Sequence, residues 1–126
     1  MGKVLPKILV VDDNNDNLLV FTAYLNDSFR LDTATNGADA LEKMQSDNYD
    51  LVVMDVKMPV MDGNTATRLY REWEKTTKSE RTPIVVVSAS AFDYHEQDSI
   101  DAGCDVFLTK PIGKKQLLEN IKHLLT

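Results

Sequence analysis

The sequence predicts an α/β fold in which helices cover both faces of a parallel sheet. Short runs rich in Val, Ile and Leu alternate with segments of helical periodicity five times along the 126 residues. Several of these runs are continuously apolar, which is typical of strands buried on both faces. The alternation indicates βαβ units with right-handed crossovers and therefore a doubly wound, three-layer sandwich. The pattern alone leaves the order of the strands open.

The first strand is predicted at 7–11, an apolar run that ends at an acidic pair. A helix begins at the Asn and Asp side chains of 14–16, because these accept hydrogen bonds from the first free N–H groups. We expect its packed face to carry Leu18, Leu19, Thr22 and Leu25. The run 29–34 alternates in polarity, which predicts a strand nearer an edge of the sheet. After a turn at 35–37, the next helix is expected to pack through Ala40, Leu41 and Met44.

The central strand is predicted at 51–55, where four apolar residues stop at an aspartate. The helix after the next loop is expected to pack through Ala66, Leu69, Tyr70 and Trp73. The stretch 75–82 has no apolar residue, which predicts a solvated helix end or a loop. A strand at 83–88 precedes a helix over 92–102, whose thin apolar stripe predicts weak packing. A strand at 105–109 leads to an amphipathic last helix with Leu117, Leu118, Ile121, Leu124 and Leu125.

Size and charge limit the classes of protein that this chain can be. We expect residues 1–126 to form one domain, because this length supports one core but not two. The net charge of −6 is the opposite of what a nucleic-acid surface requires. No apolar run has the length of a membrane span. Cys104 is the only cysteine, which excludes a disulfide framework and fits a reducing cytoplasm.

Polar residues follow the predicted strands where each strand ends. They are Asp12, Asp13, Asp55, Ser88 and Lys110. The carboxyl ends of parallel strands share one edge of the sheet, so we expect these residues to meet there. Three carboxylates in one crevice repel each other unless a cation lies among them, and Mg²⁺ suits carboxylate and phosphate oxygens. Because a carboxylate can attack phosphorus, and a lysine and a hydroxyl suit phosphoryl oxygens, the set predicts a Mg²⁺-dependent aspartyl-phosphate site.

The same residues stand in short motifs whose order resembles that of a known family. The motifs are Asp12-Asp13, Met54-Asp55, Met58-Pro59 with Met61-Asp62-Gly63, Ser88-Ala89 and Lys110-Pro111. Together they resemble the receiver domains of bacterial two-component response regulators, over essentially the whole chain. The Met-Pro-x-Met-Asp-Gly stretch is most similar to the receivers of hybrid sensor histidine kinases. We therefore expect either a receiver excised from such a kinase or a single-domain response regulator.

The resemblance implies a flavodoxin-like (βα)5 fold with a five-stranded parallel sheet in the order 2-1-3-4-5. It also implies that Asp55 accepts a phosphoryl group. Asp13 and Asp55 would ligate Mg²⁺ through their side chains. Asp12 would act largely through water, and Lys57 would contribute its backbone carbonyl.

The resemblance also assigns the residues that would respond to phosphorylation. Ser88 and Lys110 would contact the phosphoryl oxygens, and Pro111 would shape the loop through a cis peptide bond. Phe107 stands where receivers carry an aromatic switch residue, so Phe107 and Ser88 would transmit the signal. The donor would be the phosphohistidine of a histidine kinase or of a histidine phosphotransfer domain. A downstream protein would bind the fourth helix, fifth strand and fifth helix, and the domain itself would contact neither nucleic acid nor membrane.

The same residues allow other interpretations. A scaffold that works without phosphorylation is disfavoured because the acidic and lysine set is complete. A phosphatase with an aspartyl nucleophile is disfavoured because Lys57 stands where such enzymes place an acidic residue. We therefore expect that the domain is not an enzyme and promotes only its own phosphorylation and dephosphorylation. If it is part of a hybrid histidine kinase, the full-length protein would be a kinase. Asp12 and Asp13 taken alone fit a helix cap equally well, and His95 and His123 are expected on the surface.

Overall fold

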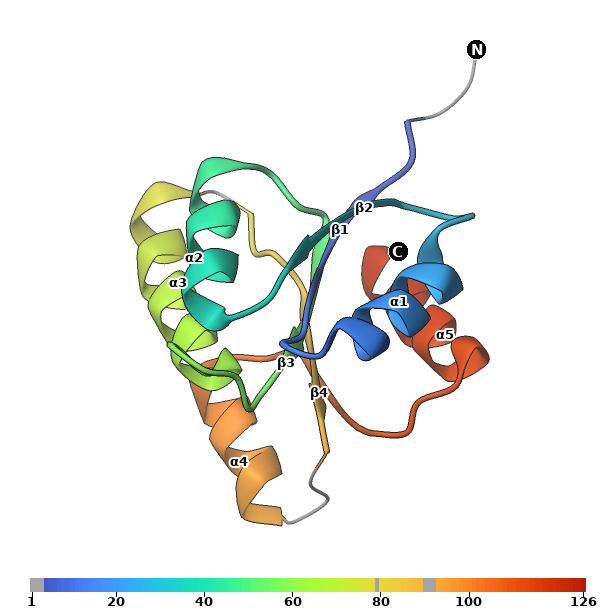
Figure 1. Cartoon of the computed structure of the whole chain (residues 1–126). Helices are drawn as coiled ribbons and strands as arrows, with labels where there is room; N and C mark the ends of the chain where they lie inside the picture. The colour runs from blue at the N-terminus through green and yellow to red at the C-terminus, as the bar shows by residue number, and fades with distance from the viewer. Residues whose placement is uncertain (1–3, 79, 90–92) are drawn as a thin grey trace.

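The computed structural model describes residues 4–78, 80–89 and 93–126, without the side chains of 93 and 94 (Figure 1). Five parallel strands form one sheet in the order β2-β1-β3-β4-β5. The strands are β1 (Lys7–Val11), β2 (Arg30–Ala34), β3 (Leu51–Asp55), β4 (Ile84–Ser88) and β5 (Val106–Thr109). The helices are α1 (Asn15–Leu25), α2 (Gly37–Ser46), α3 (Gly63–Thr77), α4 (Asp93–Ala102) and α5 (Lys114–Leu125). This arrangement confirms the predicted fold class and strand order.

Two hydrophobic layers hold the sheet between its helices. Figure 1 shows α1 and α5 on one side of the strands and α2, α3 and α4 on the other. The first layer joins the strands to the buried side chains of α1 and α5, such as Phe21 and Ile121. The second layer joins them to α2 and α3 through Met44 and Tyr70, among others. The strands β1, β3 and β4 are buried on both faces, which explains their continuously apolar sequences.

The helix faces differ from the sequence prediction in two places. In α1 the buried side chains are Leu18, Phe21 and Leu25, whereas Leu19 is 68% exposed, so its predicted packing was wrong. The spacing i, i+3, i+7 explains this, because Leu19 lies about 100° around the helix from Leu18. In α3 Ala66 and Tyr70 are buried and Trp73 packs against the same layer as predicted, whereas Leu69 is only half-buried. Of the described side chains of α4, only Ser99 and Ala102 are buried, which agrees with the weak packing predicted for this helix.

The fold brings all five strand ends to one edge, where β3 ends at Asp55, β4 ends at Ser88, and the other predicted polar residues follow β1 and β5. The register places Asp55 beside Val87 and Ser88 beside Thr109, so these ends are level with each other. Among the described residues, no helix is long and apolar enough to cross a membrane.

Candidate functional site

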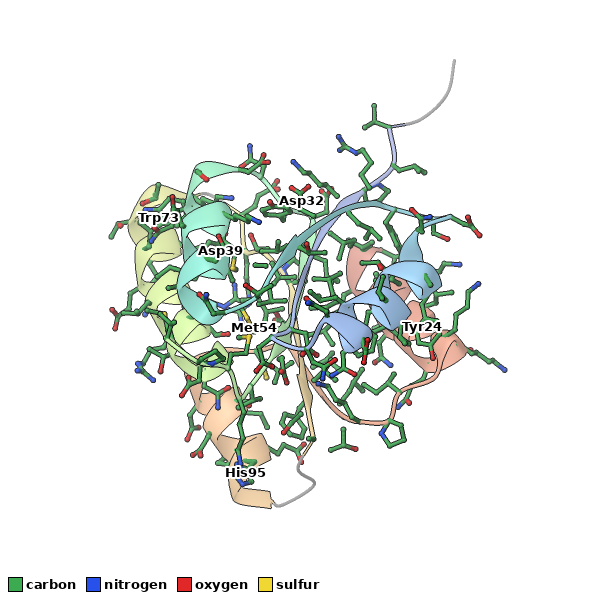
Figure 2. All side chains as sticks on the ribbon, viewed as in Figure 1. Tyr24, Asp32, Asp39, Met54, Trp73 and His95 are labelled. Carbon is green, nitrogen blue, oxygen red and sulfur yellow. The ribbon has the colours of Figure 1, made fainter. Side chains whose placement is uncertain are left out.

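The centre of the candidate site, at this carboxyl edge, is a cluster of two buried carboxylates with a partly buried lysine. Asp12 follows β1 and is fully buried, and Asp55 ends β3 with 7% of its surface exposed. The Lys110 Nζ lies 2.8 Å from Asp12 Oδ2 and 3.4 Å from Asp55 Oδ1. Met54, which precedes Asp55, is labelled near the end of β3 in Figure 2. Residues 98 positions apart in the sequence therefore meet in one crevice.

Backbone hydrogen bonds hold both buried carboxylates in place. The N–H of Asn14 donates to Asp12 Oδ1 at 2.9 Å, and the N–H of Val56 donates to Asp55 Oδ1 at 3.0 Å. Asn14, and not Asp12 or Asp13, caps α1 by accepting a hydrogen bond from Asn17. The two aspartates are therefore not used as the helix cap, which was one of the two interpretations of this pair.

The loop after β3 folds back tightly onto Asp55. The N–H of Gly63 donates to the Val56 carbonyl at 2.7 Å, and a Cβ at this glycine would lie 1.9 Å from the Asp55 carbonyl oxygen. Only glycine therefore fits where α3 begins. The middle of the loop is a turn in which Met61 N donates to the Pro59 carbonyl across Val60, which adopts a φ of 70°. A β-branched residue with positive φ is strained.

The cluster changes the protonation of its members. Burial, and then the charge of Asp12, raise the pKa of Asp55 to about 6, although Lys110 and the Val56 N–H oppose this shift. Burial lowers the pKa of Lys110, but its hydrogen bond to Asp12 and the charge of Asp55 outweigh that effect and the net shift is upward. Lys110 therefore stays charged at neutral pH, whereas the ionised form of Asp55 is disfavoured by its surroundings.

The carboxylates also have the arrangement of a cation site. Asp12, Asp13 and Asp55 each offer one oxygen, and these three oxygens lie within 4.8 Å of one another. Asp13 is exposed, so the group opens to solvent on one side. The repulsion that raises the pKa of Asp55 is the kind that a bound divalent cation relieves, and oxygen ligands suit Mg²⁺. The donor set thus fits this ion.

Comparison with known proteins assigns the chain to a family. The family model of the response regulator receiver domain matches residues 8–122. The chain belongs to the response regulator receiver domain family. This receiver is 39% identical over 115 residues to the sensor histidine kinase GacS of Pseudomonas protegens. It is 42% identical over 114 residues to the hybrid signal transduction histidine kinase G of Dictyostelium discoideum.

These matches cover most of this chain but only a small part of each relative. The matches cover 90% and 88% of the receiver but only 12% of GacS and 3% of the Dictyostelium kinase. Among solved structures, it resembles the receiver domain of the sensor histidine kinase PA1611 from Pseudomonas aeruginosa, which has a magnesium ion coordinated in its active site cleft. That likeness has a TM-score of 0.86 and 28% identity, and it covers 97% of this chain and 98% of the other. The predicted resemblance is therefore confirmed.

The remaining predicted residues surround the cluster. Ser88 is buried at the end of β4, and its carbonyl accepts a hydrogen bond from the Lys110 N–H at 2.8 Å. The Lys110–Pro111 peptide bond is cis, as expected. Phe107 is half-buried and packs against the layer that contains α2 and α3. The Lys57 side chain is exposed, and the roles expected for Ser88, Phe107 and the Lys57 carbonyl remain predictions.

A buried polar network on the far edge of the receiver was missed at the sequence level. Arg71 is 7% exposed and donates to the Glu74 carboxylate, the Thr82 and Gly103 carbonyls and the Asp105 carboxylate, at 2.8 to 3.0 Å. The i, i+3 spacing of Arg71 and Glu74 was a visible signal, but it usually marks a solvated pair. The buried Thr82 also corrects the expectation that 75–82 is solvated throughout.

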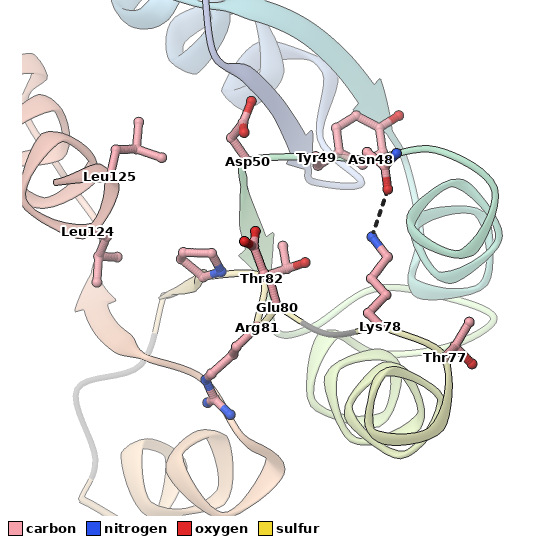
Figure 3. A pocket seen from close by; sticks show the side chains of 11 residues that line it. Asn48, Tyr49, Asp50, Thr77, Lys78, Glu80, Arg81, Thr82, Leu124 and Leu125 are labelled. Carbon is pink, nitrogen blue, oxygen red and sulfur yellow. Dashed lines mark hydrogen bonds between the residues drawn. The ribbon is translucent and has the colours of Figure 1, made fainter.

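A pocket of about 550 Å³ lies beside this network, at the edge opposite Asp55 (Figure 3). Its cationic side chains already have partners. Lys78 Nζ donates to Asn48 Oδ1 at 3.1 Å, and Arg81 forms an ion pair with Asp105 at 3.1 Å. The pocket therefore offers no unpaired cation to a ligand among the described residues, and the chemistry is concentrated at the carboxyl edge.

Proposed function

We propose that this receiver accepts a phosphoryl group from a phosphohistidine onto Asp55 and thereby acts as a switch in a phosphorelay. The observation that carries the proposal is the cluster at the carboxyl edge, in which Lys110 Nζ contacts both Asp12 and Asp55. This lysine faces two carboxylates and a third lies beside them, so the negative charges of the group outnumber its one cation. Such an excess of negative charge is suited to a site that binds a cation and a phosphoryl group.

The transfer needs an in-line attack by a carboxylate oxygen. Both hydrogen bonds that Asp55 accepts from the described residues end on Oδ1, so Oδ2 is the oxygen available for attack. The new bond joins Oδ2 to phosphorus, the phosphorus–nitrogen bond breaks, and its electron pair returns to the imidazole, which leaves the site. The product is an acyl phosphate on Asp55. Lys110 would then pair with a phosphoryl oxygen, and the Ser88 hydroxyl would donate to another.

We propose Asp12, Asp13 and Asp55 as the residues that hold Mg²⁺, with Asp12 acting largely through water and the Lys57 carbonyl as a further ligand. When bound, the ion would neutralise charge on the phosphoryl oxygens. The 4.8 Å grouping of the three carboxylates and the raised pKa of Asp55 support this role. Without a cation, the repulsion among the three carboxylates disfavours the state in which all of them are ionised.

We propose residues 1–126 as a single receiver domain of the cytoplasm that is not an enzyme toward external substrates. It would promote only its own phosphorylation and dephosphorylation, because Lys57 stands where a phosphatase of this chemistry needs a general acid. Its partners would be a histidine kinase or phosphotransfer domain and a downstream protein on α4, β5 and α5. Ser88 and Phe107 would switch that surface between two states of similar free energy.

The test is the intact mass of the protein after incubation with acetyl phosphate. We expect a single phosphoryl adduct that requires Mg²⁺ and is absent in Asp55→Asn. The matched control is Asp62→Asn, since Asp62 is exposed and caps α3, and asparagine caps equally well. Its adduct should equal that of the wild type. An unmodified wild-type protein that is folded and binds Mg²⁺ would overturn the proposal.

A further inference from the structure

A hydrogen bond between α3 and α4 lies close to the Asp55 loop, residues 56–62 between β3 and α3. The Ser99 hydroxyl on α4 donates to Asn64 Oδ1 on α3 at 2.8 Å. Ser99 has no exposed surface, whereas Asn64 is half-buried in the first turn of its helix. A buried hydroxyl must keep an acceptor, because leaving it unsatisfied is more costly than the hydrogen bond is favourable.

Asn64 is rigidly connected to Asp55. It follows Gly63, whose N–H donates to the Val56 carbonyl and whose Cα lies directly against the Asp55 backbone. The neighbouring Asp62 side chain caps the same turn by accepting the Thr65 N–H at 2.7 Å. A displacement of the Asp55 loop therefore moves Asn64 with it, and Asn64 holds Ser99.

Helix α4 is otherwise held by few contacts. Among its described side chains only Ser99 and Ala102 are buried, and Ile100 is 48% exposed. A polar groove of about 360 Å³ separates the start of α3 from α4 and is lined by Asp62, Asn64, Thr65, Arg68, Asp98, Asp101 and Ala102. Because this groove is already open to water, α4 can shift against α3 without exposing a large apolar surface.

The Ser99 hydroxyl also has a second acceptor within its own helix. A helical serine can donate to the carbonyl four residues earlier, which here belongs to His95, labelled on α4 in Figure 2. The hydroxyl can therefore stay satisfied in two positions of α4, one bonded to Asn64 and one released from it. This is the chemistry of an element with two states.

We propose that the Asn64–Ser99 hydrogen bond is the latch through which α4 senses the state of Asp55. It holds α4 against α3 in the unphosphorylated receiver and is released when the phosphorylated loop moves. The inference rests on the proposed phosphorylation of Asp55 and adds Asn64 and Ser99 to its switch as positioning residues. Neither residue makes a hydrogen bond to the carboxylate cluster, so phosphorylation itself should not require them.

The test is hydrogen exchange of the backbone amides of 97–102, with intact mass recorded on the same samples with and without acetyl phosphate and Mg²⁺. In the wild type the adduct should accelerate exchange roughly 5- to 10-fold, which corresponds to about 1 to 1.4 kcal/mol for one hydrogen bond. In Ser99→Ala exchange should already be fast, and the adduct should change it less than about twofold. Because the coupling is reciprocal, adduct formation should be at least as complete as in the wild type.

Two further variants complete the test. Asn64→Ala removes the acceptor from a half-buried position, so it gives the same readout if Ser99→Ala does not fold. Gln97→Ala is the matched control, since it removes a hydrogen bond within α4, from Gln97 Nε2 to Asp101 Oδ1, and should keep the full response to phosphorylation. A full response in Ser99→Ala or Asn64→Ala would overturn the latch alone. A wild type without an adduct would overturn the proposed function and the latch with it.

Discussion

The charge of Asp55 should destabilise the domain in the absence of a cation, and Asp55→Asn removes it. The pKa of Asp55 is raised from 3.8 to about 6 by burial and by Asp12. At 1.36 kcal/mol per pKa unit, the ionised carboxylate would cost the folded state about 3 kcal/mol. Lys110 neutralises part of this charge, and the cluster opens to water at Asp13, so the expected cost falls to about 1 to 2 kcal/mol. Asp55→Asn should be more stable than the wild type by that amount at pH 8.

The pH dependence has a definite sign. A group whose pKa is higher in the folded state favours folding while it is protonated, and this contribution is lost as the pH rises from 3.8 to about 6. The difference between Asp55→Asn and the wild type should therefore be near zero at pH 4 and fully developed above pH 6. Urea unfolding in EDTA at a series of pH values measures it. Adding Mg²⁺ should reduce the difference, because the ion stabilises the wild type by mass action.

The control and the refuting result are clear. Asp62→Asn removes an exposed carboxylate from the same loop and should change stability by less than about 0.5 kcal/mol at every pH. Equal stability of Asp55→Asn and the wild type at pH 8 in EDTA would show that the ionised Asp55 does not destabilise the folded state. A less stable Asp55→Asn would show that the contact between Asp55 and Lys110 outweighs the cost of burying the charge.

Three further changes have defined outcomes. Val60→Asn should stabilise the domain by about 1 kcal/mol in urea unfolding, because asparagine tolerates a φ of 70°, while a β-branched Val60→Thr should not. Arg71→Leu should lower stability by more than about 3 kcal/mol in thermal unfolding, since it leaves Glu74 and Asp105 without their cation, and Arg71→Lys should not restore the lost hydrogen bonds. Asp13→Asn should weaken Mg²⁺ binding at least about 10-fold in calorimetry while stability in EDTA stays nearly unchanged.

Each of these has a contrary result. Equal stability of Val60→Asn and the wild type would mean that the loop relaxes the strain elsewhere. A stable Arg71→Leu would show that Glu74 and Asp105 reach water or take up protons in its absence. Unchanged Mg²⁺ affinity in Asp13→Asn would remove this residue from the ion site.

The parts of the fold that were predictable depend on local pattern, and the parts that were not depend on partners far away in sequence. The runs at 7–11 and 51–55 are buried on both faces, and their strands were placed correctly from hydrophobicity alone. Leu19 was misplaced because adjacent leucines in a short helix leave the direction of the apolar face ambiguous, and Phe21 decides it. Arg71 could not be placed, because its burial is compensated by Asp105, 34 residues away. The strand order came from the family resemblance, since hydrophobic pattern carries no information on which strands are neighbours.

The proximity of Asp12, Asp55 and Lys110 was more predictable than the packing for a physical reason. A parallel sheet collects its carboxyl ends at one edge, so polar residues at strand ends are brought together once the strands are known. That rule placed Asp12, Asp55 and Lys110 in one crevice from their positions alone. The upward shift of the Asp55 pKa and the hydrogen bond between Asn64 and Ser99 depend on side-chain burial, which the sequence pattern does not specify.

The amino edge of the sheet contributes to stability, whereas the carboxyl edge is easier to rearrange. At the amino edge, Arg71 and its partners form a fully hydrogen-bonded buried network that fixes the end of α3 and the turn before β5. At the carboxyl edge, the domain carries a carboxylate with a raised pKa, a valine with positive φ and a helix that buries few of its described side chains. Because of these features, rearranging the carboxyl edge should require less free energy than rearranging the amino edge. Under the proposed function, a cation would relieve the repulsion there, and a phosphoryl group on Asp55 would shift α4 with a small free energy while the rest of the sheet stays in place.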